Sequence, residues 1–112
     1  IFCVNWFRTG ADGKFVWPGY GENMRVLRWI VERVEGRADG ELNAFGITPR
    51  YRDLDWSGLD FDADRFVLVS SVDAGEWQRE LALHDELFRQ LAHRLPPELP
   101  EVRRRLAERL AS

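Results

Sequence analysis

Hydrophobic residues spaced three and four positions apart predict a helix in the first third of the chain. From about Glu22 to Glu35, one face of such a helix is apolar and the other is charged. The apolar face consists of Leu27, Ile30, Val31 and Val34. Gly36 follows directly and is expected to end the helix, because glycine is the usual residue just beyond a helix C-terminus.

The last third of the chain predicts two further helices that form an antiparallel pair. Asp73 and Glu76 form a D-x-x-E capping box, which predicts a helix running to about His93. Pro96 and Pro97 interrupt it, and a last helix is expected from Pro97 or Glu98. The apolar stripes are Trp77, Leu81, Phe88 and Leu91 on the first helix and Leu99, Val102, Leu106 and Leu110 on the second. The side chains expected to face solvent on the last helix are Arg103, Arg104, Arg105, Glu108 and Arg109.

The first residues predict a β-hairpin. Ile1 to Phe7 and Lys14 to Trp17 have the composition of short strands, and the Gly- and Asp-containing turn of residues 9–13 separates them. Pro18 cannot donate to a sheet and is expected to end the second strand. The chain starts within the apolar strand rather than with Met, so we expect it to be a piece of a longer protein.

The middle of the chain lacks periodicity. Residues 37–64 are expected to form a long ordered connection held by scattered apolar side chains. These are Phe45, Ile47, Tyr51, Leu54, Trp56, Leu59 and Phe61. The run Phe66 to Val69 is compatible with either a short strand or a helical turn.

Together these elements predict an α+β fold: a short β-hairpin, a helix, a long ordered connection and a C-terminal antiparallel helix pair. We divide the chain into residues 1–36, 37–72 and 73–112, all within one structural unit. A chain of 112 residues, 45% hydrophobic and 31% charged, has the composition of a globular protein.

Charge and cysteine content exclude some classes of partner. A net charge of −3 argues against a nucleic-acid partner, which requires concentrated Lys and Arg, and a mononucleotide remains possible. No apolar run reaches the length of a membrane span, so no membrane partner is expected. Cys3 is the only cysteine, which favours a reducing, cytoplasmic location.

The usual catalytic and metal-binding motifs are not found. The run Asp60 to Asp64 has the first ligand spacings of a calcium loop, but Arg65 and Ser71 stand where glycine and glutamate are required. His84 and His93 would lie on opposite helix faces and cannot share a metal. The sequence contains no G-x-S-x-G and no P-loop motif. We therefore predict no catalytic and no metal-binding residue.

The most informative segment combines large aromatic residues with glycines. It runs Asn5-Trp6-Phe7-Arg8, then Gly13-Lys14-Phe15-Val16-Trp17-Pro18-Gly19-Tyr20-Gly21-Glu22-Asn23, then Arg25-Val26-Leu27-Arg28-Trp29-Ile30. Composition alone favours a simpler interpretation, in which these aromatics are the core of a small hairpin.

The order of these residues favours a functional interpretation instead. It resembles the guanine-binding segment of GTP-dependent phosphoenolpyruvate carboxykinases, which usually has N-W-F-R, then G-K-F-L-W-P-G-F-G-E-N, then R-V-L-x-W. The similarity continues more loosely to Glu76-Trp77. It implies that the chain is the C-terminal fragment of that larger α/β enzyme.

The resemblance implies a role for individual residues. Phe7, Phe15 and Tyr20 stand where the family stacks guanine between aromatic rings, and Trp6 is adjacent to the first of them. Asn23 stands where an asparagine contacts the guanine edge, near the backbone of Tyr20, Gly21, Glu22 and Asn23. Tyr20 departs from the more usual Phe, and its ring face is retained.

The resemblance also implies the activity of the parent enzyme. That enzyme converts oxaloacetate and GTP to phosphoenolpyruvate, GDP and carbon dioxide, with manganese and magnesium. The phosphate loop and the metal ligands of the family have no counterpart in this chain, so the fragment alone is expected to be inactive. Its expected partners are a guanine nucleotide and the upstream part of the same enzyme, and the parent is expected to be a monomer. The alternative is a non-catalytic interaction module that docks a partner through its C-terminal helices.

Overall fold

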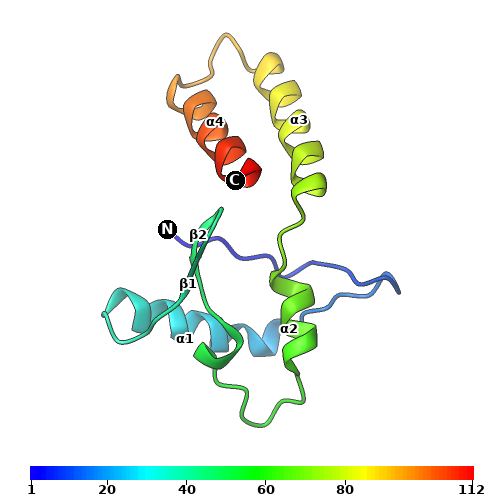
Figure 1. Cartoon of the computed structure of the whole chain (residues 1–112), viewed down its shortest axis with the longest axis vertical. Coiled ribbons are helices and arrows are strands. Elements are labelled where there is room, and N and C mark those ends of the chain that lie inside the picture. The colour runs from blue at the N-terminus through cyan, green and yellow to red at the C-terminus, as the bar shows by residue number, and fades with distance from the viewer. The chain divides into compact units, whose positions relative to one another are not determined.

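The computed structural model describes all 112 residues, and the chain divides into two compact units, Ile1–Ser71 and Val72–Ser112. The first unit contains a 3-10 turn η1 (Tyr20–Glu22), helix α1 (Asn23–Val34), strands β1 (Glu41–Asn43) and β2 (Gly46–Thr48), a second 3-10 turn η2 (Tyr51–Asp53) and helix α2 (Ala63–Ser70). The second unit contains helices α3 (Ala74–Gln90) and α4 (Glu98–Ala111) (Figure 1). The α+β class is confirmed.

The two strands lie later in the chain than predicted. β1 and β2 form a two-stranded antiparallel sheet in which Leu42 is paired with Ile47. Gly46, with φ of 124°, occupies a backbone conformation that favours glycine, and it starts β2. This hairpin lies within the segment that we expected to be an irregular connection.

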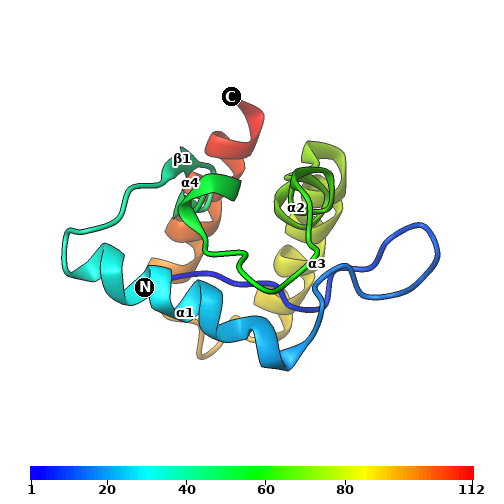
Figure 2. The same ribbon diagram turned by 90° about the horizontal axis from the view of Figure 1, so that it is seen from below.

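The strands predicted at Ile1–Phe7 and Lys14–Trp17 are wrong as strands. The chain does reverse direction there, but a single bridge between Thr9 and Phe15 is the only strand pairing. Two backbone hydrogen bonds support the reversal, from Gly10 N to Lys14 O and from Val16 N to Arg8 O. In Figures 1 and 2 the turn between them projects from the rest of the first unit. Beyond this bridge no strand pairing joins the two segments.

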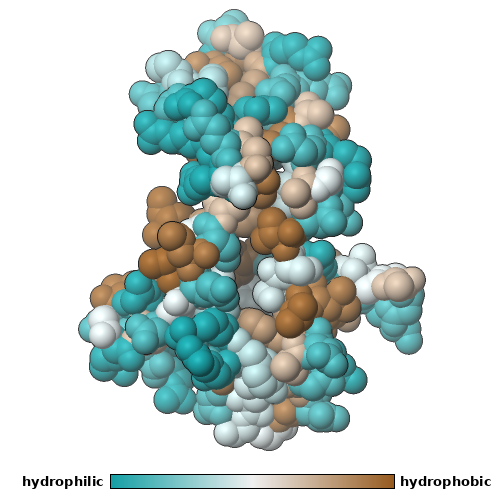
Figure 3. Space-filling view, viewed as in Figure 1, coloured by the Kyte–Doolittle hydropathy of each residue, from teal (hydrophilic) through white to brown (hydrophobic).

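Helix α1 begins at Asn23, close to the predicted start, but buries a different face. Trp29 is buried at 3% exposure, and Val26 and Ile30 pack beside it. Most of the predicted stripe is exposed: Leu27, Val31 and Val34. Periodicity identified an apolar stripe, but the large indole of Trp29, on the adjacent face, buries more surface and sets the orientation of the helix. Figure 3 shows that one face of the molecule carries brown, apolar patches among the teal, hydrophilic residues.

An aromatic core forms the centre of the first unit. Its buried members are Trp17, Trp29, Leu54, Phe61 and Phe66. Several of the apolar residues predicted to hold the connecting segment pack here, and the ring of Trp56 stacks on both Tyr51 and Phe61, with centroids 5.2 and 5.0 Å apart. The run Phe66 to Val69, which was compatible with strand or helix, is helical and belongs to α2. The Asp62 carboxylate caps this helix by accepting a hydrogen bond from Arg65 N.

The second unit is the predicted helix pair, and α3 and α4 lie side by side and antiparallel (Figure 1). The Asp73 carboxylate caps α3 by accepting from Glu76 N at 2.7 Å, as the capping signal predicted. Leu81 and Leu110 are buried between the helices, whereas Leu99 and Val102 are exposed. Arg103 was expected to face solvent and instead donates to Leu81 O and to the Asp85 carboxylate of α3. None of the helices combines the length and the apolar character that a bilayer span requires.

Candidate functional site

The projecting turn brings two parts of the aromatic segment together. The rings of Phe7 and Phe15 lie on either side of it, with centroids 5.7 Å apart and planes at 66°. The Asp12 carboxylate accepts from Lys14 N at 3.0 Å, and Gly13 has a φ of 74°, so the turn has a defined conformation. The two phenyl rings therefore form one continuous aromatic surface.

Aromatic residues of this segment fall into an exposed and a buried group. Phe7, Phe15 and Tyr20 are 70%, 63% and 92% exposed. Trp17 is 6% exposed, and the half-buried Trp6 packs against it with centroids 5.4 Å apart. Hence the three side chains that were assigned to guanine stacking lie outside the core, and the interpretation of all these aromatics as hairpin core does not hold for them.

Asn23 is linked to the buried group. The indole Nε1–H of Trp17 donates to Asn23 Oδ1 at 2.8 Å. An indole N–H is only a donor, so the amide must present its oxygen to Trp17. The amide nitrogen Nδ2 is then left with both of its donor hydrogens, and it makes no hydrogen bond within the structure.

The bend before α1 leaves the start of the helix without a side-chain cap. Gly19 has a φ of 126°, and Glu22 N donates to Gly19 O at 3.1 Å within this bend. No side chain caps η1 or α1, because the Glu22 carboxylate accepts instead from Arg25 Nε at 2.6 Å. Tyr20 and Gly21 thus lie on an open backbone turn directly before Asn23.

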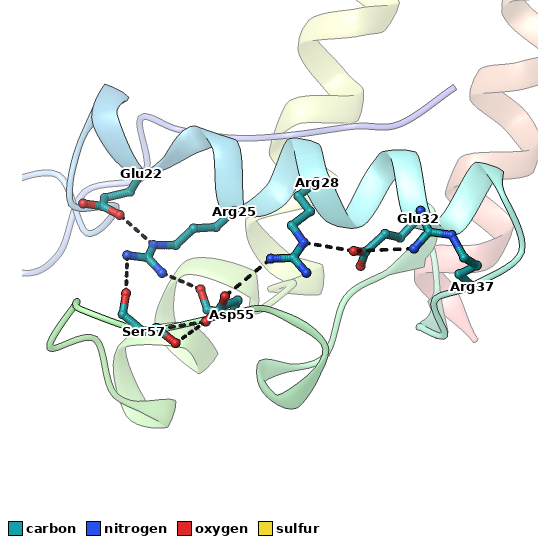
Figure 4. A network of polar contacts seen from close by, with 7 residues as sticks. All are labelled: Glu22, Arg25, Arg28, Glu32, Arg37, Asp55 and Ser57. Carbon is teal, nitrogen blue, oxygen red and sulfur yellow. Dashed lines mark hydrogen bonds and ion pairs between the residues drawn. The ribbon is translucent and has the colours of Figure 1, made fainter.

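Arg25 holds this helix start against a distant loop. Besides Glu22, it donates to Asp55 O at 2.5 Å and to Ser57 O at 2.9 Å (Figure 4). Arg28 continues the network with contacts to Asp55 and Glu32. The Ser57 hydroxyl and backbone N–H lower the pKa of Asp55, and Arg28 and Arg25 add to this effect. These contacts favour the ionised form of Asp55, and the bonds of Arg25 tie the start of α1 to the loop of residues 55–57.

A shallow depression opens beside Phe15, between the projecting turn and α2. Its volume is about 530 Å³. It contains two cationic side chains, Lys14 and Arg65, and two acidic ones, Asp12 and Asp60. Phe15 lines this depression, whereas Phe7, Tyr20 and Asn23 do not, so of the exposed rings only Phe15 borders it.

The acidic and histidine residues do not form a metal site. No three or more His, Cys, Asp or Glu side chains come together in a way that could hold a metal ion. The residues present therefore do not fit the manganese or magnesium of the resemblance.

Two residues that organise this region were not identified from the sequence. Trp17 falls at the end of a predicted strand and Arg25 on the charged face of the predicted helix, and neither is a predicted site residue. Arg25 contacts a loop about thirty positions away, which spacing cannot reveal. The bond of Trp17 to Asn23 spans the Pro-Gly bend and depends on the conformation of that bend.

Comparison with known proteins assigns the family. Residues 1–109 match the family model described as the phosphoenolpyruvate carboxykinase C-terminal P-loop domain. The chain therefore belongs to the GTP-dependent phosphoenolpyruvate carboxykinase family, and the resemblance drawn from the residue order is confirmed.

Individual relatives carry the corresponding name. The chain is 46% identical over 110 residues to phosphoenolpyruvate carboxykinase (GTP) of Anaeromyxobacter sp. strain K. It is 44% identical over 110 residues to the protein of that name from Renibacterium salmoninarum, and 42% identical over 99 residues to that from Corynebacterium jeikeium. The match covers 98% of this chain and 18% of the Anaeromyxobacter protein, so the chain spans about a fifth of the length of such relatives.

Proposed function

We propose that this chain is the guanine-binding part of an enzyme that converts oxaloacetate and GTP to phosphoenolpyruvate, GDP and carbon dioxide. The observation that carries the proposal is the exposure of Phe7, Phe15 and Tyr20, at 70%, 63% and 92%. A globular protein normally buries such rings, and rings held outside the core are available to a planar ligand. The family and its relatives' names supply the identity of that ligand.

Each residue has a defined part in the proposed site. The faces of Phe7, Phe15 and Tyr20 stack on the purine, which contributes about 1–3 kcal/mol per aromatic contact. Trp6 is adjacent to Phe7 in the chain and packs against Trp17 from its half-buried position. The open backbone at Gly21 and Glu22 allows the base to approach closely, because neither η1 nor α1 has a side-chain cap there.

Asn23 distinguishes guanine from adenine in this proposal. Guanine carries an acceptor at O6, and adenine carries an amino group at the same position. The Nδ2 donors of Asn23 can bond to guanine O6, whereas they would face the donor hydrogens of the adenine amino group. Leaving such donors unpaired costs about 1–3 kcal/mol, which is enough to favour GTP over ATP by about five- to 150-fold.

The remaining chemistry belongs to the rest of the enzyme. Phosphoryl transfer requires positioned metals and cationic clamps on the phosphates, and this chain brings together no group of side chains that could hold a metal. Stacking by the chain alone is largely offset by the lost motional freedom of the ligand. We therefore expect the chain by itself to bind guanine nucleotides with a dissociation constant on the order of millimolar, and to be inactive.

Titration of the ¹⁵N-labelled chain with GDP and ADP, followed by NMR, tests this proposal. Saturable shifts at Phe7, Phe15, Tyr20 and Asn23 with GDP, and weaker ones with ADP, are expected. Val67, an exposed apolar residue of α2, serves as an internal reference that should not shift. An equal response to the two nucleotides would contradict the role of Asn23. No response to either, together with a stable dimer through α3 and α4 in sedimentation, would favour the interaction module instead.

A further inference from the structure

We infer that Trp17 is a positioning residue that sets purine selectivity by fixing the orientation of the Asn23 amide. The inference rests on the proposed function and goes beyond it, because Trp17 is buried and lies behind the residues that would touch the base. The observation behind it is the hydrogen bond from Trp17 Nε1 to Asn23 Oδ1 at 2.8 Å.

The carboxamide of Asn23 has two orientations of nearly the same shape. A rotation of about 180° about the last side-chain torsion exchanges the oxygen and the NH₂ group at almost unchanged shape. One orientation presents donors to the ligand and suits a 6-oxo purine. The other presents an acceptor and suits a 6-amino purine. An asparagine without an anchor could adopt either orientation and would discriminate poorly.

Trp17 removes one of the two orientations. If the amide rotated, its NH₂ group would face the indole N–H, and two donors would oppose each other. The N–H of Trp17, in a side chain that is 6% exposed, would then have no acceptor. With Oδ1 held by Trp17, Asn23 can offer only donors to a ligand.

The anchor is effective because the core holds the indole ring. Trp17 packs against Trp6, Phe61 and Trp56, with ring centroids 5.4, 5.8 and 6.3 Å apart. Several large rings on different sides leave little freedom for the direction of Nε1–H. The aromatic core of the first unit thus determines which atom of the half-buried Asn23 amide meets the base.

The test compares two tryptophan-to-phenylalanine variants of the chain. Trp17→Phe keeps an aromatic ring and removes the N–H. The matched control, Trp29→Phe, makes the same chemical change at another buried tryptophan, whose Nε1 donates to Asp39 O and not to Asn23. Dissociation constants for GDP, IDP and ADP are measured by NMR titration, and the fold of each variant is checked by its amide spectrum. IDP is included because it keeps O6 and lacks the 2-amino group.

We expect the wild-type chain and Trp29→Phe to prefer GDP and IDP over ADP by the same ratio. In Trp17→Phe this ratio should fall about tenfold, the size of one lost hydrogen-bond constraint. A purely structural role of Trp17 would weaken the three nucleotides equally, and an unchanged ratio would therefore overturn the inference. If the wild-type chain itself binds GDP and ADP equally, the proposed guanine site is contradicted. That outcome is distinct from an unchanged ratio in Trp17→Phe.

A second variant protects the test against misfolding. If Trp17→Phe does not give a folded spectrum, Trp17→benzothienylalanine is prepared by semisynthesis. This residue has the size and shape of tryptophan, with sulfur in place of the N–H, so packing is retained and only the donor is lost. Loss of the GDP-to-ADP ratio in this variant supports the inference, and retention of the ratio overturns it.

Discussion

Phe7 and Phe15 meet edge to face across the projecting turn, with ring centroids 5.7 Å apart. They come from the two separate motifs of the aromatic segment, and the bridge between Thr9 and Phe15 brings them together. Their mutual contact leaves both rings more than half exposed. A surface of exposed aromatic rings therefore exists although the predicted strands do not.

Removing one ring should affect the ligand far more than the fold. Phe15→Ala and Tyr20→Ala are each expected to weaken GDP binding by about five- to 150-fold, since a stacked ring contributes about 1–3 kcal/mol. In the full-length enzyme the same changes should raise the KM for GTP. The free energy of unfolding of the chain should change by less than about 1 kcal/mol, because both side chains are exposed.

Val67→Ala is the control for these truncations. It shortens a side chain that is 62% exposed, close to the 63% of Phe15, and it lies on α2, outside the aromatic segment in the sequence. It should leave GDP binding unchanged. Equal binding by Phe15→Ala and Val67→Ala would remove Phe15 from the site.

Local signals predicted most of the helices. The Asp73 cap, the glycine at position 36 with φ of 74° and the helix start after Pro97 depend on a few neighbouring residues, so the sequence alone was sufficient. Strands depend on a distant partner, and Ile1–Phe7 has none in this chain. The same limit applies to the site, because the bond between Trp17 and Asn23 exists only once the bend between them has formed.

Gly40 is expected to be the glycine most sensitive to substitution. A Cβ at this position would lie 2.6 Å from Ile47 Cγ2 and 2.8 Å from Thr48 O, and the latter is a backbone atom that cannot move aside. Gly40→Ala should therefore lower the free energy of unfolding by about 1–3 kcal/mol, as overpacking does. Urea denaturation followed by tryptophan fluorescence measures this change.

Gly21→Ala provides the contrast. Nothing lies within 4 Å of a Cβ built there, and the substitution should be neutral or slightly stabilising. Its effect on GDP binding then tests whether the base approaches this backbone as proposed. Equal stability of Gly40→Ala and Gly21→Ala would contradict the close contact of position 40 with Ile47 and Thr48.

The helix pair should depend strongly on Leu81, which is 1% exposed between α3 and α4. Leu81→Ala is expected to cost about 2–5 kcal/mol, because it removes buried methyl groups and leaves a cavity. Hydrogen exchange of the α3 and α4 amides measures this loss locally. Leu83→Ala on the same helix removes a side chain that is 56% exposed and should accelerate exchange little. Similar exchange in the two variants would contradict the observed packing.

The stability of α4 should fall in acid because of Glu101. Its carboxylate accepts from Arg104 Nη2 and Nε, both at 2.8 Å, and from Arg105 Nε at 2.7 Å. The hydrogen bonds from Arg104 and then Arg105 lower the pKa of Glu101 from 4.5 to about 2. A pKa that is lower in the folded state means that folding favours the ionised form. The contribution is therefore complete above pH 4.5 and is lost as the pH falls toward 2.

Glu101→Gln should remove this part of the pH dependence. Thermal melts of the chain are followed by helical circular dichroism between pH 6 and pH 2, and an NMR titration reports the carboxyl group of Glu101 directly. The wild-type melting temperature should fall more steeply below pH 4.5 than that of Glu101→Gln. High salt should reduce the difference, because the group is exposed and its ion pairs are screened. Glu86→Gln, an exposed glutamate of α3 without an ion-pair partner, should keep the wild-type slope. Identical acid slopes for Glu101→Gln and the wild type would mean that the arginine contacts do not hold this carboxylate in solution.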